Sequence, residues 1–416
     1  MGKYRYHAPM NFDVIIIGGG LVGASLAAAL RHSGLSLALV EGGADPLPTP
    51  HPNPLPLAGE GVDESLRDAV SDSWDSRIYA ISPGSRRFLG QAGAWALLDP
   101  NRIAPVEAMR VFGDAGAQLE FSAYQMGAPE LACILENSAL HHALWQRLQQ
   151  QDNLTLLHPA CCAALTLGTE TIELTLADGR SLTASLLVGA DGRDSWVRQQ
   201  AGIAAAPLDY RQSGVVANFG CELPHRGIAH QWFQPDGILA LLPLPGNRVS
   251  MVWSVSPEKS AELLALPPDA LCDRVSAAAQ HTLGALQLIT PAAAFPLRLL
   301  ALPKISAPRV ALIGDAAHNM HPLAGQGVNT GFRDARQLAQ LLVERGAQYD
   351  CGDAQLLRAY ERKRKEDLYT MQVTTYGLKH LFNNDDPVLR RLRNFGLSVT
   401  DHLAPLKKML MRHALH

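Results

Sequence analysis

The sequence predicts an α/β protein (α+β overall) that combines a discontinuous Rossmann-type domain, an inserted antiparallel β-sheet domain and a helical C-terminal region. Three observations predict this fold class. A glycine-rich turn follows a short apolar segment near the N-terminus, two further apolar segments end at glycine or aspartate much later in the chain, and segments of alternating polarity lie between them. Because the elements typical of a parallel sheet are separated in sequence, the domain that they form is expected to be discontinuous.

Composition limits the classes of protein to which the chain can belong. Its 416 residues suffice for two or three domains, and a hydrophobic content of 47% can bury a large core. A net charge of −3 argues against a nucleic-acid partner. The six cysteines form no CxxC pair, which favours free thiols in a reducing compartment. Because no apolar run approaches the roughly 20 residues of a membrane span, we expect a cytoplasmic protein, either soluble or peripheral at the inner face of a membrane.

The N-terminal element is predicted to be a βαβ unit. A strand over residues 12–17 precedes the turn GGGLVG, a helix follows, and a second strand over residues 37–40 ends at Glu41. The glycines of the GxGxxG pattern are Gly18, Gly20 and Gly23. In such a unit the helix N-terminus receives a pyrophosphate, and an acid about 20 residues farther on holds ribose hydroxyls. The unit therefore predicts a dinucleotide site, and an acid at this position favours FAD or NAD over NADP.

Residues 42–72 differ in composition from the segments around them. They are rich in proline and glycine and show no periodicity, which predicts a flexible insertion without chemistry of its own. Regular structure is expected to resume at DSRIYAISPGSRRFL, as a strand followed by a helix to about Leu98.

The middle of the chain is predicted to contain both strands and helices. Alternating polarity predicts antiparallel strands within 106–123, 171–176, 215–221 and 238–255, and helical periodicity predicts helices over 136–151, 257–281, 330–346 and much of 354–396. These elements give the expected domain boundaries. The Rossmann-type domain is expected to comprise 10–104, 125–203 and 293–350, the β-sheet domain 105–124 and 204–292, and the C-terminal helical region 351–416.

Two later motifs repeat the arrangement of a buried strand that ends in a polar residue. The first is LLVGADGR, in which an apolar strand leads to Asp191 and Gly192. The second is GDAAHNMHPLAGQGVNTGFRDA, which follows a strand over 309–313 and begins with Gly314 and Asp315. Its glycines leave backbone amides uncovered, and the helix that follows directs its positive end at the same loop. Because ligands of α/β sheets bind at the carboxyl ends of strands, these motifs predict a site for a polar, anion-bearing cofactor.

The three motifs, in this order and at these separations, resemble those of the aromatic-ring hydroxylases of the p-hydroxybenzoate hydroxylase type, the class A flavin monooxygenases. Within that group the chain resembles the ubiquinone-biosynthesis FAD-dependent hydroxylase family. The matching text includes DVIIIGGGLVGASLA, DSRIYAIS, ILENSALHHALW, LLVGADGRDSWVR, ILALLPLPGNRVSMVWS and RVALIGDAAHNMHPLAGQGVNTGFRDA, and it spans residues 12 to about 412. The 42–72 insertion is longer than the family's usual connection.

The resemblance implies which residues bind FAD. These residues are Gly18, Gly20, Gly23, Glu41, Arg77, Asn137, Asp191, Gly192, Gly314, Asp315, Pro322, Gly325, Gly327, Val328 and Asn329. The first four would hold the ADP half of FAD. Arg77 would reach the pyrophosphate side, Asn137 would lie along the ribityl and phosphate region, and Asp315 would bond the ribityl chain. Asp191 and Gly192 would serve both the flavin and the nicotinamide.

The resemblance also implies a catalytic environment for the flavin ring. Its members would be His318, Pro322, Gly325 and Gln326. Residues 322–329 would line the isoalloxazine ring, and their N–H groups would stabilise its reduced, anionic form. Two interpretations of His318 stay open, a positioned acid–base group or a packed polar residue. Neither His318 nor His321 is expected to bind a metal, because the sequence offers no third ligand.

The activity implied by the resemblance is that of an FAD-dependent monooxygenase that hydroxylates the aromatic ring of a polyprenylated phenol in ubiquinone biosynthesis. NAD(P)H or another electron donor would reduce FAD, O2 would add to give a C4a-hydroperoxyflavin, and the distal oxygen would pass to the phenol. Because this intermediate decays in water, an apolar substrate domain is expected. The segment around Trp232, Phe233, residues 239–244 and Trp253 either supplies its wall or forms ordinary sheet core.

Two alternative functions stay open. A soluble aromatic-compound hydroxylase or a flavin reductase would share the fold, because a fold hosts many functions. A non-catalytic flavin-binding scaffold of a biosynthetic complex is an alternative of a different class. The presence of all three flavin motifs disfavours that scaffold.

The C-terminal region is basic. Residues 355–416 contain 12 Lys and Arg against 6 Asp and Glu, in a chain of net charge −3. This pattern indicates either a solvated helical face or a surface that contacts anionic lipid or an acidic partner. Because a polyprenylated substrate resides in a bilayer, we expect this region to provide peripheral membrane contact or to join a ubiquinone-biosynthesis complex.

Overall fold

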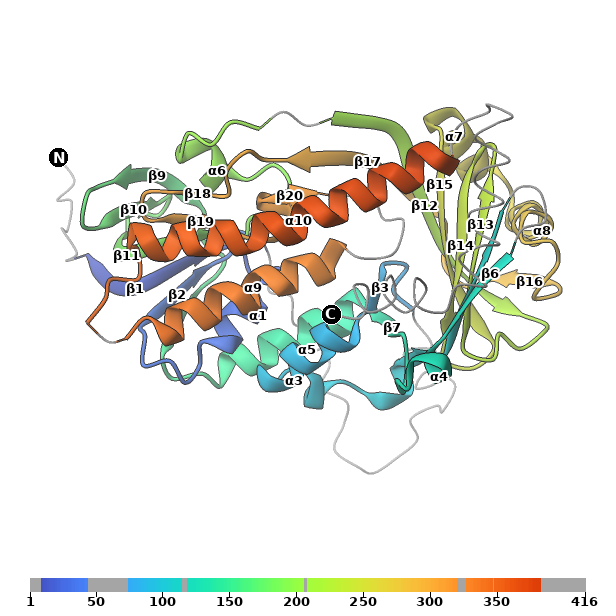
Figure 1. Cartoon of the computed structure of the whole chain (residues 1–416), viewed down its shortest axis with the longest axis horizontal. Helices are drawn as coiled ribbons and strands as arrows, with labels where there is room; N and C mark the ends of the chain where they lie inside the picture. Colours follow the sequence, from blue (N-terminus) through green and yellow to red (C-terminus); the bar gives the residue numbers. More distant parts are fainter. Residues whose placement is uncertain are drawn as a thin grey trace, which may run out of the picture.

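The structure of the chain is a computed structural model, which describes residues 9–43, 74–113, 118–205, 208–319, 327–346 and 348–382. The described part forms three sheets, of eight, nine and three strands. In Figure 1 the eight-stranded sheet and its helices occupy the left half of the molecule. Most of the nine-stranded sheet occupies the right half, and its strands β17 and β20 extend toward the left. Most of the predicted 42–72 insertion and the predicted C-terminal region beyond residue 382 lie outside the described residues.

A mainly parallel sheet forms the Rossmann-type half. Its strands are β1 (Met10–Ile17), β2 (Leu37–Val40), β8 (Leu154–Leu157), β9 (Cys162–Leu167), β10 (Ile172–Leu176), β11 (Ser181–Gly189), β18 (Ser306–Ala307) and β19 (Val310–Leu312). They run in the order β18–β19–β11–β1–β2–β8, and β10 and β9 extend from β11 as an antiparallel pair. Strands β19, β11, β1, β2 and β8 are parallel, so their carboxyl ends share one edge of the sheet.

Helices cover this sheet and give it a buried core. They are α1 (Leu21–Ala29), α3 (Pro83–Gln91), α5 (Asn137–Gln149), α6 (Trp196–Gln200), α9 (Gly327–Glu344) and α10 (Ala354–Phe382). The centre of β1, Val14 to Ile16, is fully buried, as expected of a parallel strand with both faces covered. Helix α10 runs along α9 (Figure 1), and its buried Tyr360 donates a 2.8 Å hydrogen bond to the Leu312 oxygen of β19.

A mostly antiparallel sheet forms the second half. Its strands are β5 (Ala108–Phe112), β6 (Gln118–Ser122), β12 (Leu208–Cys221), β13 (Ile228–Gln234), β14 (Gly237–Leu244), β15 (Arg248–Val255), β16 (Leu286–Leu288), β17 (Ala293–Ala301) and β20 (His318–Asn319). The order is β20–β17–β12–β15–β14–β13–β5–β6, with β16 beside β12. Helices α7 (Pro257–Ala265) and α8 (Pro268–Ala278) contribute Leu263 and Val275 to the apolar core on one face of the sheet.

A small sheet lies between the two halves. It consists of β3 (Ile78–Ile81), β4 (Ala104–Val106) and β7 (Ala132–Glu136), and the short helix α4 (Ala123–Met126) precedes β7. Single 3₁₀ turns lie at Trp95–Leu97, Pro100–Arg102 and Gly314–Ala316. Val106 and Ile134 of this sheet pack against Ala229 and Leu244 of the nine-stranded sheet, on the face away from α7 and α8.

The predicted fold class is confirmed, and so are several of its elements. The strand predicted over 37–40 is β2, and the helix predicted over 136–151 is α5. The single helix predicted over 257–281 is wrong, because α7 ends at Ala265 and α8 begins at Pro268. Proline lacks the N–H that a continuous helix requires and fits at the first position of a new one, so the prolines at 267 and 268 separate the two helices.

Strand β17 differs from the predicted division of the chain. The predicted boundaries include residues 293–301 in the Rossmann-type domain, but these residues pair with β12 in the nine-stranded sheet. Their side chains do not alternate regularly between buried and exposed positions, so the period that identifies a strand is absent from this segment.

All six cysteines lie in described residues and are free thiols. Across the described ranges, no helix combines the length and the apolar composition that crossing a membrane requires.

Candidate cofactor site

The predicted motifs converge because their strands are neighbours. Strand β1 leads into Gly18, β2 into Glu41, β11 toward Asp191 and β19 toward Gly314. These four strands are adjacent and parallel, so the motifs lie along one edge of the sheet. At Gly314 the backbone has φ +60° and passes so close to Val22 of α1 that a Cβ atom would lie 3.1 Å from its methyl carbon.

The glycine-rich turn allows backbone contacts that a side chain would block. A Cβ atom at Gly18, whose φ is +103°, would lie 2.4 Å from the oxygen of Ala190, and one at Gly23 would lie 2.0 Å from the oxygen of Gly18. The absence of side chains at these two glycines therefore allows α1 to pack closely against the strand ends. Gly20 differs, because it is exposed and no atom lies within 4 Å of the position that its Cβ would take. The turn thus leaves open space at the start of α1.

The Glu41 side chain hydrogen-bonds to the backbone of this turn. Its carboxylate accepts hydrogen bonds from the Gly19 N–H at 2.6 Å and from the Gly43 N–H at 2.7 Å. An ionised carboxylate offers about four lone-pair positions, so further donors such as ribose hydroxyls can still bind it. The role of Glu41 toward a ribose stays a prediction.

Arg77 lies near both Asn137 and Asp315. The Asn137 N–H, at the start of α5, donates to the Arg77 oxygen at 2.9 Å. The Asp315 side chain is open to solvent, yet the surrounding protein desolvates it enough to raise the pKa of its carboxyl, against the opposing charges of His318, Arg77 and Arg193. An acid in these surroundings is available to accept hydrogen bonds from a ligand.

The Asp191 side chain is engaged within its own loop. It accepts hydrogen bonds from the Ser195 hydroxyl at 2.5 Å and from the Val197 N–H at 3.0 Å, and Gly192 turns the chain with φ +79°. The buried Arg198 then donates to the Ala316 oxygen at 3.0 Å, which joins the second motif to the third. No local sequence signal indicates this contact of Arg198, because its partner lies 118 residues away.

His318 is buried against a charged network rather than exposed toward a substrate. Its Nε2 lies 2.6 Å from Oδ2 of Asp334, and Arg364 donates to Oδ1 of the same carboxylate at 2.5 Å. Arg364 also pairs with Asp367 within α10. The contacts of Asp334 with His318 and Arg364 therefore link α9 to β20 and α10. Burial opposes a charge on Asp334, but His318 and Arg364 hold the pKa of its carboxyl below the ordinary value. This geometry favours the interpretation of His318 as a packed polar residue.

Asn329 holds the start of α9 to another segment. Its Oδ1 accepts from the Ser82 N–H at 2.9 Å, and its Nδ2 donates to the Ala80 oxygen at 2.7 Å, so the side chain joins residues 247 positions apart. Gly327 and Val328, at the first turn of the same helix, are half-buried. The remaining residues predicted in this loop, namely His321, Pro322, Gly325 and Gln326, lie outside the described residues.

Two of the aromatic residues considered for a substrate wall belong to the sheet core. Trp232 and Trp253 are buried with Leu239 in the cluster that α7 and α8 cover. Phe233 alternates with Trp232 along β13, so its ring lies on the opposite face, where it packs near Val111. The two tryptophans therefore belong to the ordinary core of the sheet. The face of the sheet away from α7 and α8 is the one available for a substrate.

Comparison with known proteins identifies the family. A model of the FAD binding domain matches residues 11–372. The chain is 36% identical to ubiquinone hydroxylase UbiL of Rhodospirillum rubrum, over 97% of this chain and 89% of that protein. It is 34% identical to 3-demethoxyubiquinol 3-hydroxylase of Escherichia coli, over 97% and 98%, and 33% identical to human ubiquinone biosynthesis monooxygenase COQ6, over 97% and 92%. The chain belongs to the FAD-dependent ubiquinone-biosynthesis hydroxylase family. It is therefore an FAD-dependent aromatic-ring monooxygenase.

Solved structures share the fold of this FAD-dependent monooxygenase. The probable FAD-dependent monooxygenase pqsL of Pseudomonas aeruginosa superposes with a TM-score of 0.73 at 22% identity, over 94% of this chain and all of that one. The p-nitrophenol 4-monooxygenase PnpA of Pseudomonas putida gives 0.74 at 16% identity, over 98% and 99%.

The residues present fit the cofactor of this family. Gly20 begins α1 without a side-chain cap, and no described residue accepts a hydrogen bond from its N–H. The open space at Gly20 and the N-terminus of α1 suit a pyrophosphate, and Glu41 lies where the adenosine ribose would follow.

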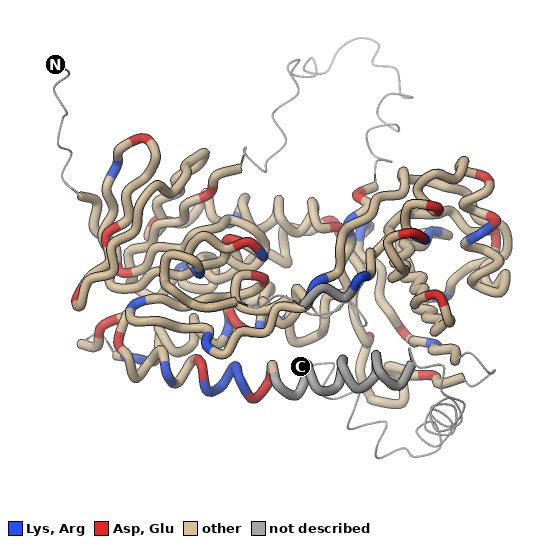
Figure 2. Tube along the Cα trace, turned by 90° about the horizontal axis from the view of Figure 1, so that it is seen from above, with Lys and Arg blue, Asp and Glu red and all other residues tan. Residues whose placement is uncertain are grey.

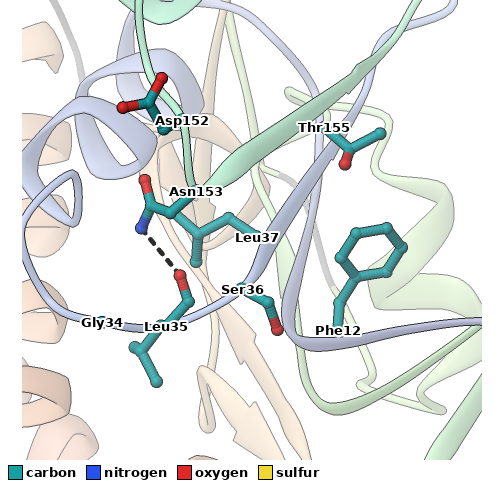
Figure 3. Close-up of a pocket in the computed structure, with 8 residues that line it drawn as sticks. All are labelled: Phe12, Gly34, Leu35, Ser36, Leu37, Asp152, Asn153 and Thr155. Carbon is teal, nitrogen blue, oxygen red and sulfur yellow. Dashed lines mark hydrogen bonds between the residues drawn. The ribbon is translucent and has the colours of Figure 1, made fainter.

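A surface pocket lies away from the predicted FAD site. It is lined by Phe12, Gly34, Leu35, Ser36, Leu37, Asp152, Asn153 and Thr155, and Figure 3 shows Asn153 bonded to the oxygen of Leu35. These residues lie at the beginnings of β1, β2 and β8, at the edge opposite the motifs. Cofactors of parallel sheets bind at the carboxyl edge, so this pocket is not a candidate for FAD.

The buried contacts of Asp334 with His318 and Arg364 are expected to stabilise the fold. The variant Asp334→Asn is expected to lose about 3–5 kcal/mol of unfolding free energy at neutral pH, because it removes the buried carboxylate that pairs with both Arg364 and His318 and leaves Arg364 with Asp367 alone. The folded pKa of Asp334 lies below its unfolded value, so the contribution is complete above about pH 4 and is lost as the pH falls through the folded value. Urea unfolding at several pH values measures both effects.

Asp178 provides the matched control for this variant. It forms an exposed ion pair with Arg180, so Asp178→Asn is expected to change the unfolding free energy by less than about 1 kcal/mol. Equal losses in the two variants would contradict the proposed importance of the buried network.

Proposed function

We propose that this chain hydroxylates the aromatic ring of a polyprenylated phenol in ubiquinone biosynthesis, using O2 and electrons from NAD(P)H or another donor. The observation that carries the proposal is the extent of the similarity. Relatives named for ubiquinone chemistry match 97% of the chain, so the similarity includes the nine-stranded sheet as well as the Rossmann-type half. A soluble catabolic hydroxylase or a reductase of the same fold would be expected to match the cofactor half better than the sheet.

The chain's own residues are proposed to bind and orient the cofactor. The open turn at Gly20 would take the pyrophosphate, Glu41 the adenosine ribose and Asp315 the ribityl chain, while Arg77 and Asn137 would flank the phosphates. When bound, FAD supplies the activation of O2 and the electrophilic oxygen that side chains cannot provide. The protein contributes position, exclusion of water and a polar environment for the phenol.

The face of the nine-stranded sheet away from α7 and α8 is proposed as the substrate wall. Figure 1 shows α8 on the outer side of this sheet, so the opposite face is turned toward the Rossmann-type half. A row of cross-strand neighbours on that face consists of Val111, Gln231, Ala240, Val252, Val216 and Ala293. Five of the six are small or branched and apolar, which suits a flat ring in a dry site.

Filling this row tests the proposed wall. Val252 is half-buried at its centre, so Val252→Trp is expected to occupy the space of the ring and to lower kcat/KM for a prenylated phenol at least tenfold. The dissociation constant of FAD should change less than twofold, since the row lies on the other sheet. The control Val343→Trp, at a position 55% exposed on α9, should leave both quantities unchanged. Equal turnover in the wild type and Val252→Trp would remove this face from consideration.

Genetic complementation tests the proposed reaction. Strains that each lack one ubiquinone ring-hydroxylation step would express this chain, and their accumulated quinone precursors would be analysed by mass spectrometry. We expect one or more strains to regain ubiquinone and to lose the precursor that precedes the missing hydroxyl. Failure in every strain, with the protein expressed and loaded with FAD, would contradict the proposal.

We also propose that the chain is a cytoplasmic protein that docks peripherally on anionic membranes, either directly or within a ubiquinone-biosynthesis complex. Arg358, Arg362, Lys363 and Lys365 are exposed on α10, and Figure 2 shows basic residues along the described part of that helix. Basic side chains near an anionic leaflet each contribute about 1 kcal/mol to binding. A surface of this kind would bring the site to a substrate whose tail lies in the bilayer.

Sedimentation with vesicles tests this docking. The chain is expected to bind phosphatidylglycerol vesicles, to bind phosphatidylcholine vesicles at least tenfold less, and to dissociate in high salt because exposed charges are screened. Arg358→Glu with Arg362→Glu, or deletion of residues 397–416, should weaken binding, whereas Arg180→Glu with Arg226→Glu should not. Equal binding by all variants would contradict a role for the C-terminal region.

A further inference from the structure

Two side chains of α5 contact one backbone carbonyl of the glycine-rich turn. Trp145 donates its indole N–H to the Gly19 oxygen at 2.8 Å, and Nε2 of His141 lies 2.9 Å from the same oxygen. Because a carbonyl oxygen only accepts, His141 must donate here and carries a proton on Nε2. The two residues are four positions apart, so they lie on the same face of the helix.

Gly19 is held through both of the peptide units that it joins. Its N–H donates to Glu41 at 2.6 Å, while its oxygen receives the two donors of α5. A Cβ atom at Gly19 would lie 2.6 Å from a ring carbon of Trp145, so only glycine fits against the indole. Trp145 is fully buried and packs edge-on against His158, with ring centroids 4.9 Å apart. The indole is therefore fixed in place, and through the Gly19 oxygen it fixes the Gly19–Gly20 peptide.

The orientation of this peptide determines the direction of the next amide. In a planar trans peptide the C=O of Gly19 and the N–H of Gly20 point in opposite directions. The Gly19 oxygen points into α5, so the Gly20 N–H points away from α5. That N–H has no acceptor among the described residues, and Gly20 is exposed beside open space at the first turn of α1.

We infer that His141 and Trp145 are positioning residues for the FAD pyrophosphate. They hold the Gly19–Gly20 peptide so that its N–H, and not its C=O, faces the phosphates. Glycine populates many backbone conformations, so a turn of three consecutive glycines has little preference of its own for this orientation. A reversed peptide would direct a carbonyl oxygen at the anionic phosphates. The inference rests on the FAD site of the proposed function and adds a residue pair to it.

Substitutions that remove one donor and keep the ring test the inference. Trp145→Phe and His141→Phe are each expected to raise the dissociation constant of FAD about tenfold, measured by flavin fluorescence with the apoprotein. His141→Gln keeps an N–H donor and should restore most of the affinity. The ³¹P resonances of bound FAD should shift in the Phe variants, because they report the hydrogen bonds of the phosphates.

Trp253→Phe is the matched control. Trp253 is also buried, and its indole N–H has no partner among the described residues, so this variant removes an N–H that orients nothing. It should leave the FAD dissociation constant and the ³¹P resonances unchanged. If Trp145→Phe folds poorly, His141→Phe gives the same test at a half-buried position.

The outcomes separate this inference from the proposed function. Wild-type protein that does not bind FAD would contradict the proposed function itself. Wild-type protein that binds FAD, together with Phe variants whose dissociation constants lie within twofold of it and whose ³¹P resonances are unchanged, would overturn only the positioning role. If the Phe variants of His141 and Trp145 lose only thermal stability, and Trp253→Phe loses as much, the role of His141 and Trp145 is purely structural.

Discussion

Helix α1 begins without a side-chain cap, and the site depends on that. The first amides of a helix have no intrahelical acceptors, and Gly20 offers no side chain to satisfy them. An anion is the natural complement of such an end. Gly18 and Gly23 bring the helix close to the strand ends, and the parallel sheet delivers Glu41 and Asp315 to the same edge. A dinucleotide site follows from these constraints together.

Buried polar contacts join the segments that carry the motifs to one another. Arg198 joins the second motif to the third, Asn329 joins the start of α9 to the β3–α3 connection, and Asp334 joins β20 and α9 to α10 through His318 and Arg364. Each side chain is buried, and each contact connects distant parts of the chain. Residues that do not themselves contact the cofactor therefore hold this edge of the sheet in position. A buried ion pair of this kind contributes most through the cost of breaking it.

The sequence predicted the fold and the residues at the strand ends, because apolar runs and glycines are local signals. It could not predict the partners of those residues. Arg198 and Asn329 bond to groups 118 and 247 positions away, and nothing near either residue indicates which group that is. His318 belongs to the third motif, but its burial against Asp334 depends on how α9 packs. The break between α7 and α8 did have a signal, the prolines at 267 and 268, whereas the irregular burial of β17 gave none.

A single turnover under ¹⁸O₂ tests the central claim most directly. The FAD-loaded protein would be reduced without oxygen, mixed with a prenylated phenol and exposed to ¹⁸O₂, and the product would be analysed by mass spectrometry. We predict one ¹⁸O atom in a new ring hydroxyl for each flavin reoxidised. Complete reoxidation of the flavin to give hydrogen peroxide, with the phenol unchanged for every prenylated ring offered, would contradict the account.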